Sequence, residues 1–248
     1  MKPLGALLLG TAAYGVFLVA TLPAAFIAPQ VARTTHGQVS LAKAAGTLWN
    51  GSARADVALP GTAFTIDEVR WRFLPSRLLA GRISFAIEAR VAKLEARLEA
   101  ARGPLQWSVR DLRASGDAGA LASLFPLASA WQPAGAIAIE AAHLAWDGRQ
   151  ASGTASAEWR DAALALSAAR PLGSWRAQAD AQGAAVKVTL ATIRGPLRLA
   201  GNGTLQLPGR FTFAGEARAE PGRERELEQL LDLLGPRRAD GARTLAVR

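Results

Sequence analysis

Cysteine is absent from the 248 residues of this chain, and histidine occurs only twice. No disulfide, thiol nucleophile or thiolate metal site is therefore available. His36 and His143 have no second metal-binding residue at helical or hairpin spacing, which favours structural roles for both. We expect neither a metal nor a cofactor. The absence of cysteine does not identify a cellular compartment.

Catalytic signatures are equally scarce. No Gly-x-Ser-x-Gly elbow occurs, and the glycine-containing stretches 10–15 and 201–204 lack the lysine and the strand-to-helix setting of a phosphate loop. Asp67 and Glu68 are adjacent, so in a strand they would point to opposite faces and would not cooperate as an acid/base pair. Nor can any two carboxylates be paired for glycan hydrolysis. The sequence predicts a protein that is not an enzyme and has no small-molecule substrate.

Runs of like charge are also missing. The chain has 29 lysine and arginine residues against 20 aspartate and glutamate residues, a formal charge of +9 that comes almost entirely from arginine. The arginines stand singly, often beside an acid, as in ARVAKLEARLEAAR. No nucleic-acid-binding motif accompanies them, so we expect no nucleic-acid partner.

One long hydrophobic run is present, at the N-terminus. Residues 4–27 are predominantly apolar, and no charge occurs between Lys2 and Arg33. About 20 apolar residues cross a bilayer core of roughly 30 Å, whereas the core of a cleaved signal peptide is about 7–15 residues long. We favour an uncleaved single-pass anchor at 4–27, after a cytoplasmic segment 1–3 and before a linker 28–38, with a cleaved signal as the alternative. Charge bias alone does not fix the orientation, because Arg33 and Lys43 follow the run.

The body, residues 39–236, is dominated by a period of two. From Ala92 to Ala100 every even residue is apolar and every odd residue is charged, which is typical of a half-buried strand. Alanine, glutamate, arginine and leucine also favour helices, but a helical face here would mix charged and apolar residues. Residues 83–87 predict a preceding strand in the same way. The expected fold is mainly β, a curved antiparallel sheet with a few short helices.

Turn signals and tryptophans recur along this body. Asn-Gly or Asp-Gly pairs occur in WNGS at 49–52, WDGR at 146–149 and GNGT at 201–204, and each predicts a hairpin turn. Six of the seven tryptophans lie in or beside expected strands, which fits either packing or an aromatic-lined groove. We interpret one set of glycines and tryptophans as a structural signature: Gly46, Trp49, Gly51, Trp71, Trp131, Trp146, Gly148, Trp159, Gly195 and Gly201.

Three helical segments are expected besides the anchor. Residues 117–126 begin at Asp117, a capping residue, and residues 74–81 end at a glycine. Near the end, ERELEQLLDLLGP carries four leucines at helical spacing, and we expect this helix to pack on the sheet, with a partner helix as the alternative occupant of its apolar face. The tail, residues 237–248, is expected to be loose.

Taken in order, several segments resemble one known family. They are AGTLWNGSA, VRWRFLPSRLLAGRISF, ASAWQPAGAIAIEAAHLAWDG, GTASAEWRDAALALSAARPLGSW, VKVTLATIRGPLRLAGNGTL and LLDLLG. Together, from about residue 39 to residue 235, their order and spacing resemble the type II secretion system protein N family. The N-terminal run does not match this family residue by residue.

The resemblance implies an accessory component of the machine that exports folded proteins across the outer membrane. It implies one inner-membrane span, a periplasmic domain and contacts with other secretion components, among which the outer-membrane secretin is one suggestion. The family has no catalytic motif to transfer. It also resembles β-rich AsmA-like envelope proteins, and a periplasmic carrier of lipid or another hydrophobe is therefore the alternative function.

Overall fold

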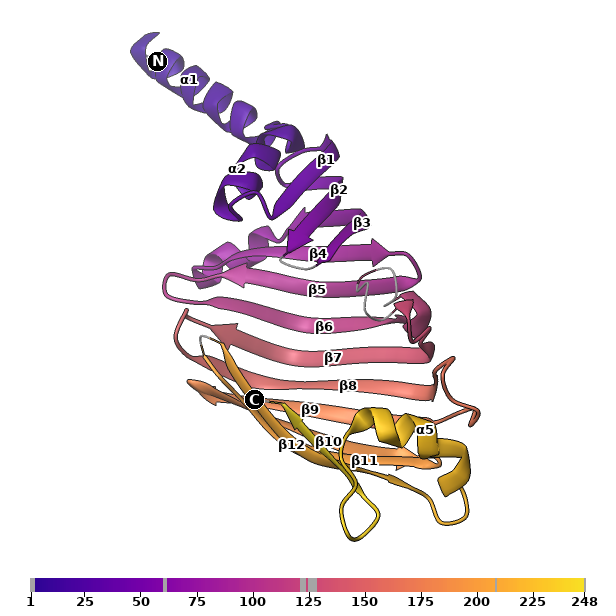
Figure 1. Cartoon of the computed structure of the whole chain (residues 1–248). Helices are drawn as coiled ribbons and strands as arrows, with labels where there is room; N and C mark the ends of the chain where they lie inside the picture. The colour runs from indigo at the N-terminus through magenta and orange to yellow at the C-terminus, as the bar shows by residue number, and fades with distance from the viewer. Residues whose placement is uncertain (1–2, 60–61, 121–123, 125–128, 208, 248) are drawn as a thin grey trace.

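The chain folds around one open antiparallel sheet of 13 strands (Figure 1). The computed structural model describes residues 3–59, 62–120, 124, 129–207 and 209–247, and for residues 3–9 and residue 12 it describes the backbone alone. Each strand pairs with its neighbours in sequence, so the order in the sheet is β1 to β13, and β1 and β13 form its two edges. The expected mainly β, antiparallel fold is thus confirmed.

The strands are mostly 8 to 13 residues long. Their bounds are β1 Val39–Gly46, β2 Asn50–Leu59, β3 Thr62–Phe73, β4 Ile83–Val91, β5 Leu94–Arg102, β6 Trp107–Asp117, β7 Ala134–Trp146, β8 Ala151–Ala163, β9 Gly173–Gly183, β10 Ala185–Arg194, β11 Leu197–Gln206, β12 Arg210–Ala219 and β13 Arg243–Val247.

The strand with the clearest alternation is present. β5 pairs with β4 in unbroken register from Ile83 opposite Arg102 to Val91 opposite Leu94. The predicted strand at 92–100 therefore starts two residues later than expected. Ala92 has a φ of 51° and forms the turn, and its backbone N–H donates to the Asp67 carboxylate at 2.9 Å. Alternation has outweighed the helix propensity of this segment.

Of the three predicted turns, one lies where expected. Asp147 and Gly148 form the β7–β8 turn, in which the Asp147 carboxylate accepts hydrogen bonds from the backbone N–H groups of Arg149 and Gln150 at 2.8 and 2.7 Å. The β1–β2 turn is at 47–49, so the predicted Asn-Gly pair instead begins β2. The prediction for 201–204 was wrong, because this stretch lies inside β11.

The helices are short. η2 Pro75–Ala80 is a 3₁₀ helix that ends at Gly81 in the left-handed conformation, as the sequence indicated. α5 Glu224–Leu234 confirms the leucine-rich helix. Asp117 ends β6, its carboxylate accepts the Gly119 N–H at 2.6 Å, and η3 Ala118–Ala120 follows. Most of the rest of the helix expected at 117–126 lies outside the described residues.

The N-terminal run does not form one continuous helix. α1 Pro3–Ala20 is followed by η1 Ala24–Phe26 and α2 Ile27–Thr34. Pro23 is extended, with φ −65° and ψ 145°, which separates the two parts. In the part of the chain that the structure describes, no helix combines the length and apolar character needed to span a membrane.

The C-terminal tail is more ordered than expected. Residues 243–247 form β13, which pairs with β12 from Ala217 opposite Arg243 to Phe213 opposite Val247. Arg243 also forms an ion pair with Asp232 of α5. The prediction of a loose tail was wrong for this stretch, because edge pairing supplies backbone hydrogen bonds that its composition did not signal.

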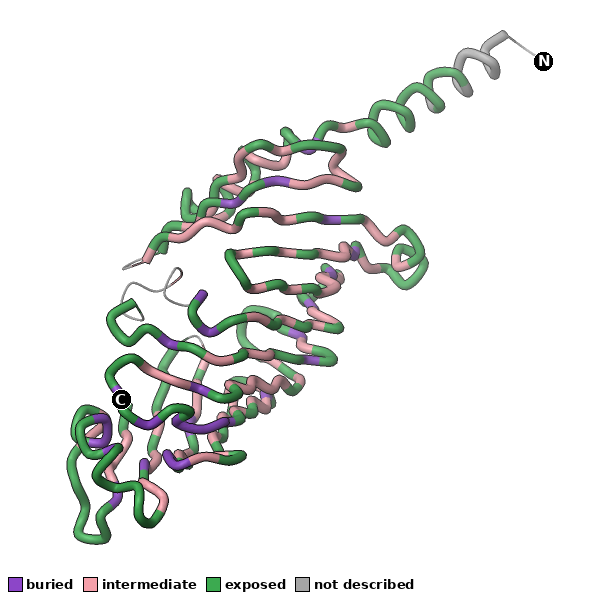
Figure 2. The backbone as a smooth tube through the Cα atoms, turned by 90° about the vertical axis from the view of Figure 1, so that its right-hand side faces the viewer, coloured by how far each residue is buried: buried purple, intermediate pink, exposed green. Residues whose placement is uncertain are grey.

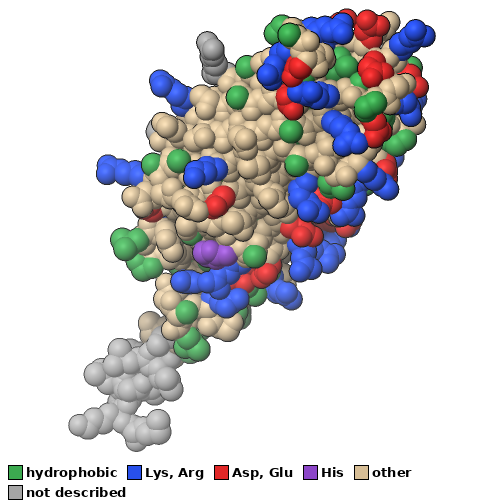
Figure 3. Space-filling view, turned by 90° about the horizontal axis from the view of Figure 1, so that it is seen from below, with side chains coloured by type: hydrophobic (Ala, Val, Ile, Leu, Met, Phe, Trp, Pro, Cys, Tyr) green, Lys and Arg blue, Asp and Glu red, His purple; other side chains and the backbone are tan. Residues whose placement is uncertain are grey.

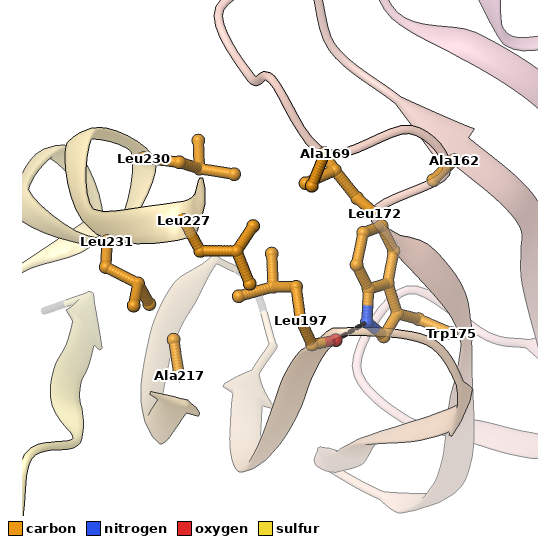
Figure 4. Packing of buried hydrophobic residues seen from close by; sticks show 9 residues of the cluster. All are labelled: Ala162, Ala169, Leu172, Trp175, Leu197, Ala217, Leu227, Leu230 and Leu231. Carbon is orange, nitrogen blue, oxygen red and sulfur yellow. Dashed lines mark hydrogen bonds between the residues drawn. The ribbon is translucent and has the colours of Figure 1, made fainter. Parts of the chain in front are cut away.

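Buried residues are few and are scattered along the sheet (Figure 2), and the two clusters of buried hydrophobic residues lie at its two ends. The larger buried cluster lies under α5, where three of its leucines pack on Leu197, Leu172 and Trp175 (Figure 4). The smaller one joins η1 to β2 and β3 through Ala24, Ala53 and Trp71. Over the middle strands the described elements form a single layer, which is the sheet itself.

Candidate functional site

The two faces of the sheet differ in chemistry along its whole length. Paired residues in an antiparallel sheet point to the same face. In β3 to β5, Val69, Ala89 and Ala96 share one face, whereas Arg70, Glu88 and Arg97 share the other. The same division continues in β10 to β12. We call these the apolar face and the charged face.

The charged face carries a network of exposed ion pairs. Glu158 on β8 accepts hydrogen bonds from Arg176 and from Arg160, whose Nε lies 2.7 Å from Oε2. These arginines, Arg176 first, hold the pKa of Glu158 below its ordinary value of 4.5. Figure 3 shows basic and acidic side chains intermingled along one side of the molecule. Such a surface is well solvated and leaves little apolar area for a partner.

The apolar face is hollowed beside α5. A cavity of about 640 Å³, the α5 cavity, has an almost wholly apolar lining. Trp159 and Trp175 meet edge to face there with centroids 5.5 Å apart, and their indole N–H groups donate to backbone carbonyl groups, each at 3.0 Å. The α5 cavity is lined by Trp131, Pro133, Trp159, Leu164, Leu172, Trp175, Leu197, Leu199, Leu230 and Leu234.

A second apolar hollow of about 360 Å³ lies at the opposite strand ends. We call it the Trp146 cavity. Trp107 pairs with Trp146 across β6 and β7, and small residues of β8 and β9 form the floor. Because those residues are alanine and glycine, the sheet surface is shallow and open between the tryptophans. The floor includes Ala151, Gly153, Ala155, Ala179 and Ala181.

Between these cavities the apolar face is not covered by any described element. Ile139, in the middle of β7, is 38% exposed although it points to this face. An ordinary domain would cover such a surface with a second layer, because a large continuous apolar patch marks an interaction site. The uncovered apolar face is therefore the candidate functional site.

The predicted glycines support the sheet rather than enter this site. A Cβ on Gly51 would lie 2.6 Å from the Trp71 ring, and a Cβ on Gly201 would overlap the ring of Phe213. Gly46, Gly148 and Gly195 have φ values of 84°, 101° and 118° at hairpin ends. Each occupies a place that a larger residue would disturb.

The predicted tryptophans divide between packing and the site. Trp71 is buried and donates to the Leu48 carbonyl at 3.0 Å. Trp49 donates to the Val19 carbonyl at 2.7 Å and so ties α1 to the body. Trp131, Trp146 and Trp159 line the two cavities. Trp49 and Trp71 thus serve packing, and for the other three tryptophans a binding groove lined with aromatic residues stays a prediction.

Several residues of the site had no individual sequence signal. Leu172, Leu197 and Leu199 line the α5 cavity, yet each reads in sequence as one apolar residue among many. Leu197 and Leu199 are two residues apart in β11 and so share one face, but the turn predicted at 201–204 hid this strand. The α5 cavity also depends on α5 folding back over β11 and β12. The alternation of residues within a strand does not predict this contact.

Acidic and basic side chains gather on the charged face. A hollow of about 650 Å³ there includes Glu140, Asp180 and Lys187. His143 lies on the same face of β7 and pairs in register with Arg110. Among the described residues, no group of three or more His, Asp or Glu side chains is placed to hold a metal ion.

Comparison with known proteins gives one match. A family model described as type II secretion system (T2SS), protein N, matches residues 37–246, which is most of the chain and all thirteen strands except the last residue of β13. No curated protein and no solved structure matches the chain.

Proposed function

Since the chain belongs to the type II secretion system protein N family, we propose that it is a non-enzymatic accessory component of that machine, held at the inner membrane with its sheet in the periplasm. Its task is to contact other secretion components while folded proteins cross the outer membrane. The single observation that supports this most is the uncovered apolar face. Its apolar hollows provide area for contact with a partner and contain few groups that could take part in catalysis.

The proposed anchor is the α1 part of the apolar run 4–27, because Ala24 of the same run packs on β2 and β3. α1 forms the larger part of this run, and its segment carries no charged side chain. Tyr14, Phe17 and Val19 are exposed around it, as lipid contact would require. Two hydrogen bonds, Leu48 N to Leu22 O and Trp49 Nε1 to Val19 O, join the end of the run to the β1–β2 turn.

The proposed contact surface for a partner is the apolar face over β7 to β10. Interface cores are enriched in aromatic residues, and exposed tryptophans supply much of their binding energy. Trp131 and Ile139 are exposed on this face. A segment of another secretion component, such as the secretin, would bury them by lying across the strands.

In-cell photocrosslinking tests this proposal. Ile139 and Glu140 are neighbours on β7 and both are exposed, but they point to opposite faces. With a benzophenone amino acid at Ile139, we expect a crosslink to a type II secretion component, identified by mass spectrometry. The same probe at Glu140 is the matched control. Equal capture at the two positions, or capture only at Glu140, would argue against the apolar face as the contact surface.

A second candidate function, a periplasmic carrier of lipid or another hydrophobe, is favoured by one observation. The floor of the Trp146 cavity is built of alanine and glycine, and small residues leave room for an acyl chain. Native mass spectrometry of the gently extracted chain would then show bound lipid. Ala179→Trp should displace it, whereas Gln178→Trp on the charged face should not. A lipid-free mass for the unaltered chain would exclude this function.

A further inference from the structure

Along one side of the sheet, the ends of the strands expose more apolar surface than packing within the chain explains. η2 presents Leu79, which is 95% exposed, and the β5–β6 turn presents Leu105, which is 85% exposed. Trp107 and Trp146 are each half exposed at the adjoining ends of β6 and β7. We call this the aromatic edge, and it comprises Leu78, Leu79, Ile83, Leu105, Trp107 and Trp146.

The pairing register shows that these residues form one continuous row. Ile83 on β4 pairs with Arg102 on β5, Arg102 pairs with Trp107 on β6, and Trp107 pairs with Trp146 on β7. Four neighbouring strands therefore end in apolar or arginine side chains on the apolar face. In Figure 1 these strand ends and η2 lie on the same side of the sheet.

Arginines accompany the apolar side chains of this edge. Arg102 lies over the Trp107 ring, with its guanidinium carbon 4.7 Å from the ring centroid. Arg82 precedes Ile83, and Arg149 follows Trp146 in the β7–β8 turn. For these three arginines the described residues provide no salt bridge, although Asp147 lies in the same turn as Arg149. Tryptophan and arginine together are typical of a membrane–water interface with anionic headgroups.

The edge lies beside the place where α1 joins the body. Trp49, in the β1–β2 turn that bonds to the end of the N-terminal run, has its ring 5.0 Å from that of Phe73. The ring centroid of Phe73 in turn lies 5.4 Å from that of Phe85. Phe85 is on β4, two residues from Ile83. An unbroken path of packed aromatic rings thus leads from the end of α1 to the start of the aromatic edge.

We propose that the aromatic edge rests on an anionic bilayer surface next to the α1 anchor, with Leu79, Leu105 and the two tryptophans in the interfacial layer and the arginines on lipid phosphates. This inference rests on the membrane anchoring proposed above and specifies which side of the sheet faces the membrane. Interfacial insertion of this kind reaches about 5–10 Å into the headgroup boundary. It would place the Trp146 cavity at the membrane, because Trp107 and Trp146 belong both to the aromatic edge and to the lining of that cavity.

The natural absence of cysteine allows a direct test with the full chain. Single-cysteine variants Leu105→Cys, Lys93→Cys and Phe17→Cys are labelled with a polarity-sensitive fluorophore and placed in nanodiscs of equimolar phosphatidylcholine and phosphatidylglycerol. Lys93 is the matched control, since it lies in the β4–β5 turn at the opposite strand ends. Quenching by lipids that carry a nitroxide near the headgroup reports contact with the interface.

We expect the label at residue 105 to lose most of its fluorescence while the label at residue 93 is unaffected. Replacing phosphatidylglycerol by phosphatidylcholine should weaken the quenching at 105 and leave that at 17 unchanged. Quenching at 17 without quenching at 105, or equal quenching at 105 and 93, would overturn the edge proposal and leave the anchor standing. The label at residue 17 is also tested with lipids that carry the nitroxide on the acyl chain. If these lipids do not quench it, the anchoring is overturned, and the edge proposal with it.

Discussion

Glycine serves two distinct needs in the hairpins of this sheet. Gly148 and Gly195 both have φ values that side chains rarely adopt, 101° and 118°. Around Gly148 the space is open, whereas a Cβ on Gly195 would overlap Gly173 and lie 2.9 Å from the Leu172 carbonyl. Backbone strain is common to the two sites, but crowding is specific to the second.

This difference gives a matched pair of substitutions. Gly148→Ala should cost about 1 kcal/mol of the free energy of unfolding, from φ strain alone. Gly195→Ala should cost a further 1–3 kcal/mol or so, because backbone must move to admit the methyl group. Denaturant unfolding of the detergent-solubilised chain measures both. Equal losses for the two variants would show that crowding at Gly195 does not matter.

The ion pairs of the charged face predict a pH dependence. Arg176 and Arg160 lower the pKa of Glu158, so the folded state favours the ionised carboxylate more than the unfolded chain does. Its contribution to stability is therefore present above the ordinary pKa of 4.5 and is lost as the pH falls through the lowered value. Glu158→Gln should be less stable than the unaltered chain at neutral pH, and the difference should shrink below pH 4.5. A constant difference across that range would contradict it.

Among the elements, α5 shows how a short amphipathic helix completes an otherwise open layer. Leu227, Leu230 and Leu231 are buried against β11, β12 and the β8–β9 connection, while Leu233 is 63% exposed (Figure 4). Burial of a leucine side chain stabilises by about 1.5–3 kcal/mol. The helix therefore holds the α5 cavity in shape as well as covering one end of the sheet.

Two leucines of this helix form a second matched pair. Leu227→Ala removes a side chain with no exposed surface and should cost about 2–5 kcal/mol, because it leaves a cavity. Leu233→Ala, further along α5, should change stability by less than about 0.5 kcal/mol. Thermal unfolding measured by circular dichroism compares them. Similar losses would mean that α5 does not pack on the sheet through its leucine face.

Elements were more predictable than the turns between them. Alternation over 83–87 and 92–100 identified β4 and β5 because period two puts charge and apolar residues on opposite faces. Asn-Gly at 50–51 and GNGT at 201–204 misled, since the glycines there make room for Trp71 and Phe213 across the sheet. Such crowding depends on the neighbouring strand, which a local turn signal does not contain. β13 was missed for the same reason.

At the scale of the whole molecule, the sequence predicted a two-faced sheet but not the shape of its apolar face. The alternation gives each strand one apolar side, and neighbour pairing then joins these sides into one surface. Among the described residues, helices pack on the sheet at its two ends, around Ala24 and at Leu227, and the apolar face between them stays open. Which stretch stays uncovered is a tertiary property that no single segment carries.

An exposed face of this kind is costly for a protein working alone and useful for one that works by contact. Hydrophobic area left in water does not stabilise the monomer, and it lowers the solubility of the protein. The chain belongs to a family of type II secretion system proteins, and the function proposed above uses such a face to contact other components of that machine. The proposed orientation, with the aromatic edge on the membrane, would leave the face over β7 to β10 pointing along the bilayer.

Export measured in cells tests the role of the apolar face most directly. Ile139→Glu and Thr189→Glu place the same new charge on exposed residues of opposite faces. In a strain that depends on this chain, we expect Ile139→Glu to abolish export of folded cargo and Thr189→Glu to leave it unchanged, with equal amounts of both variants in the membrane fraction. Normal export by cells carrying Ile139→Glu would contradict a function that depends on this face.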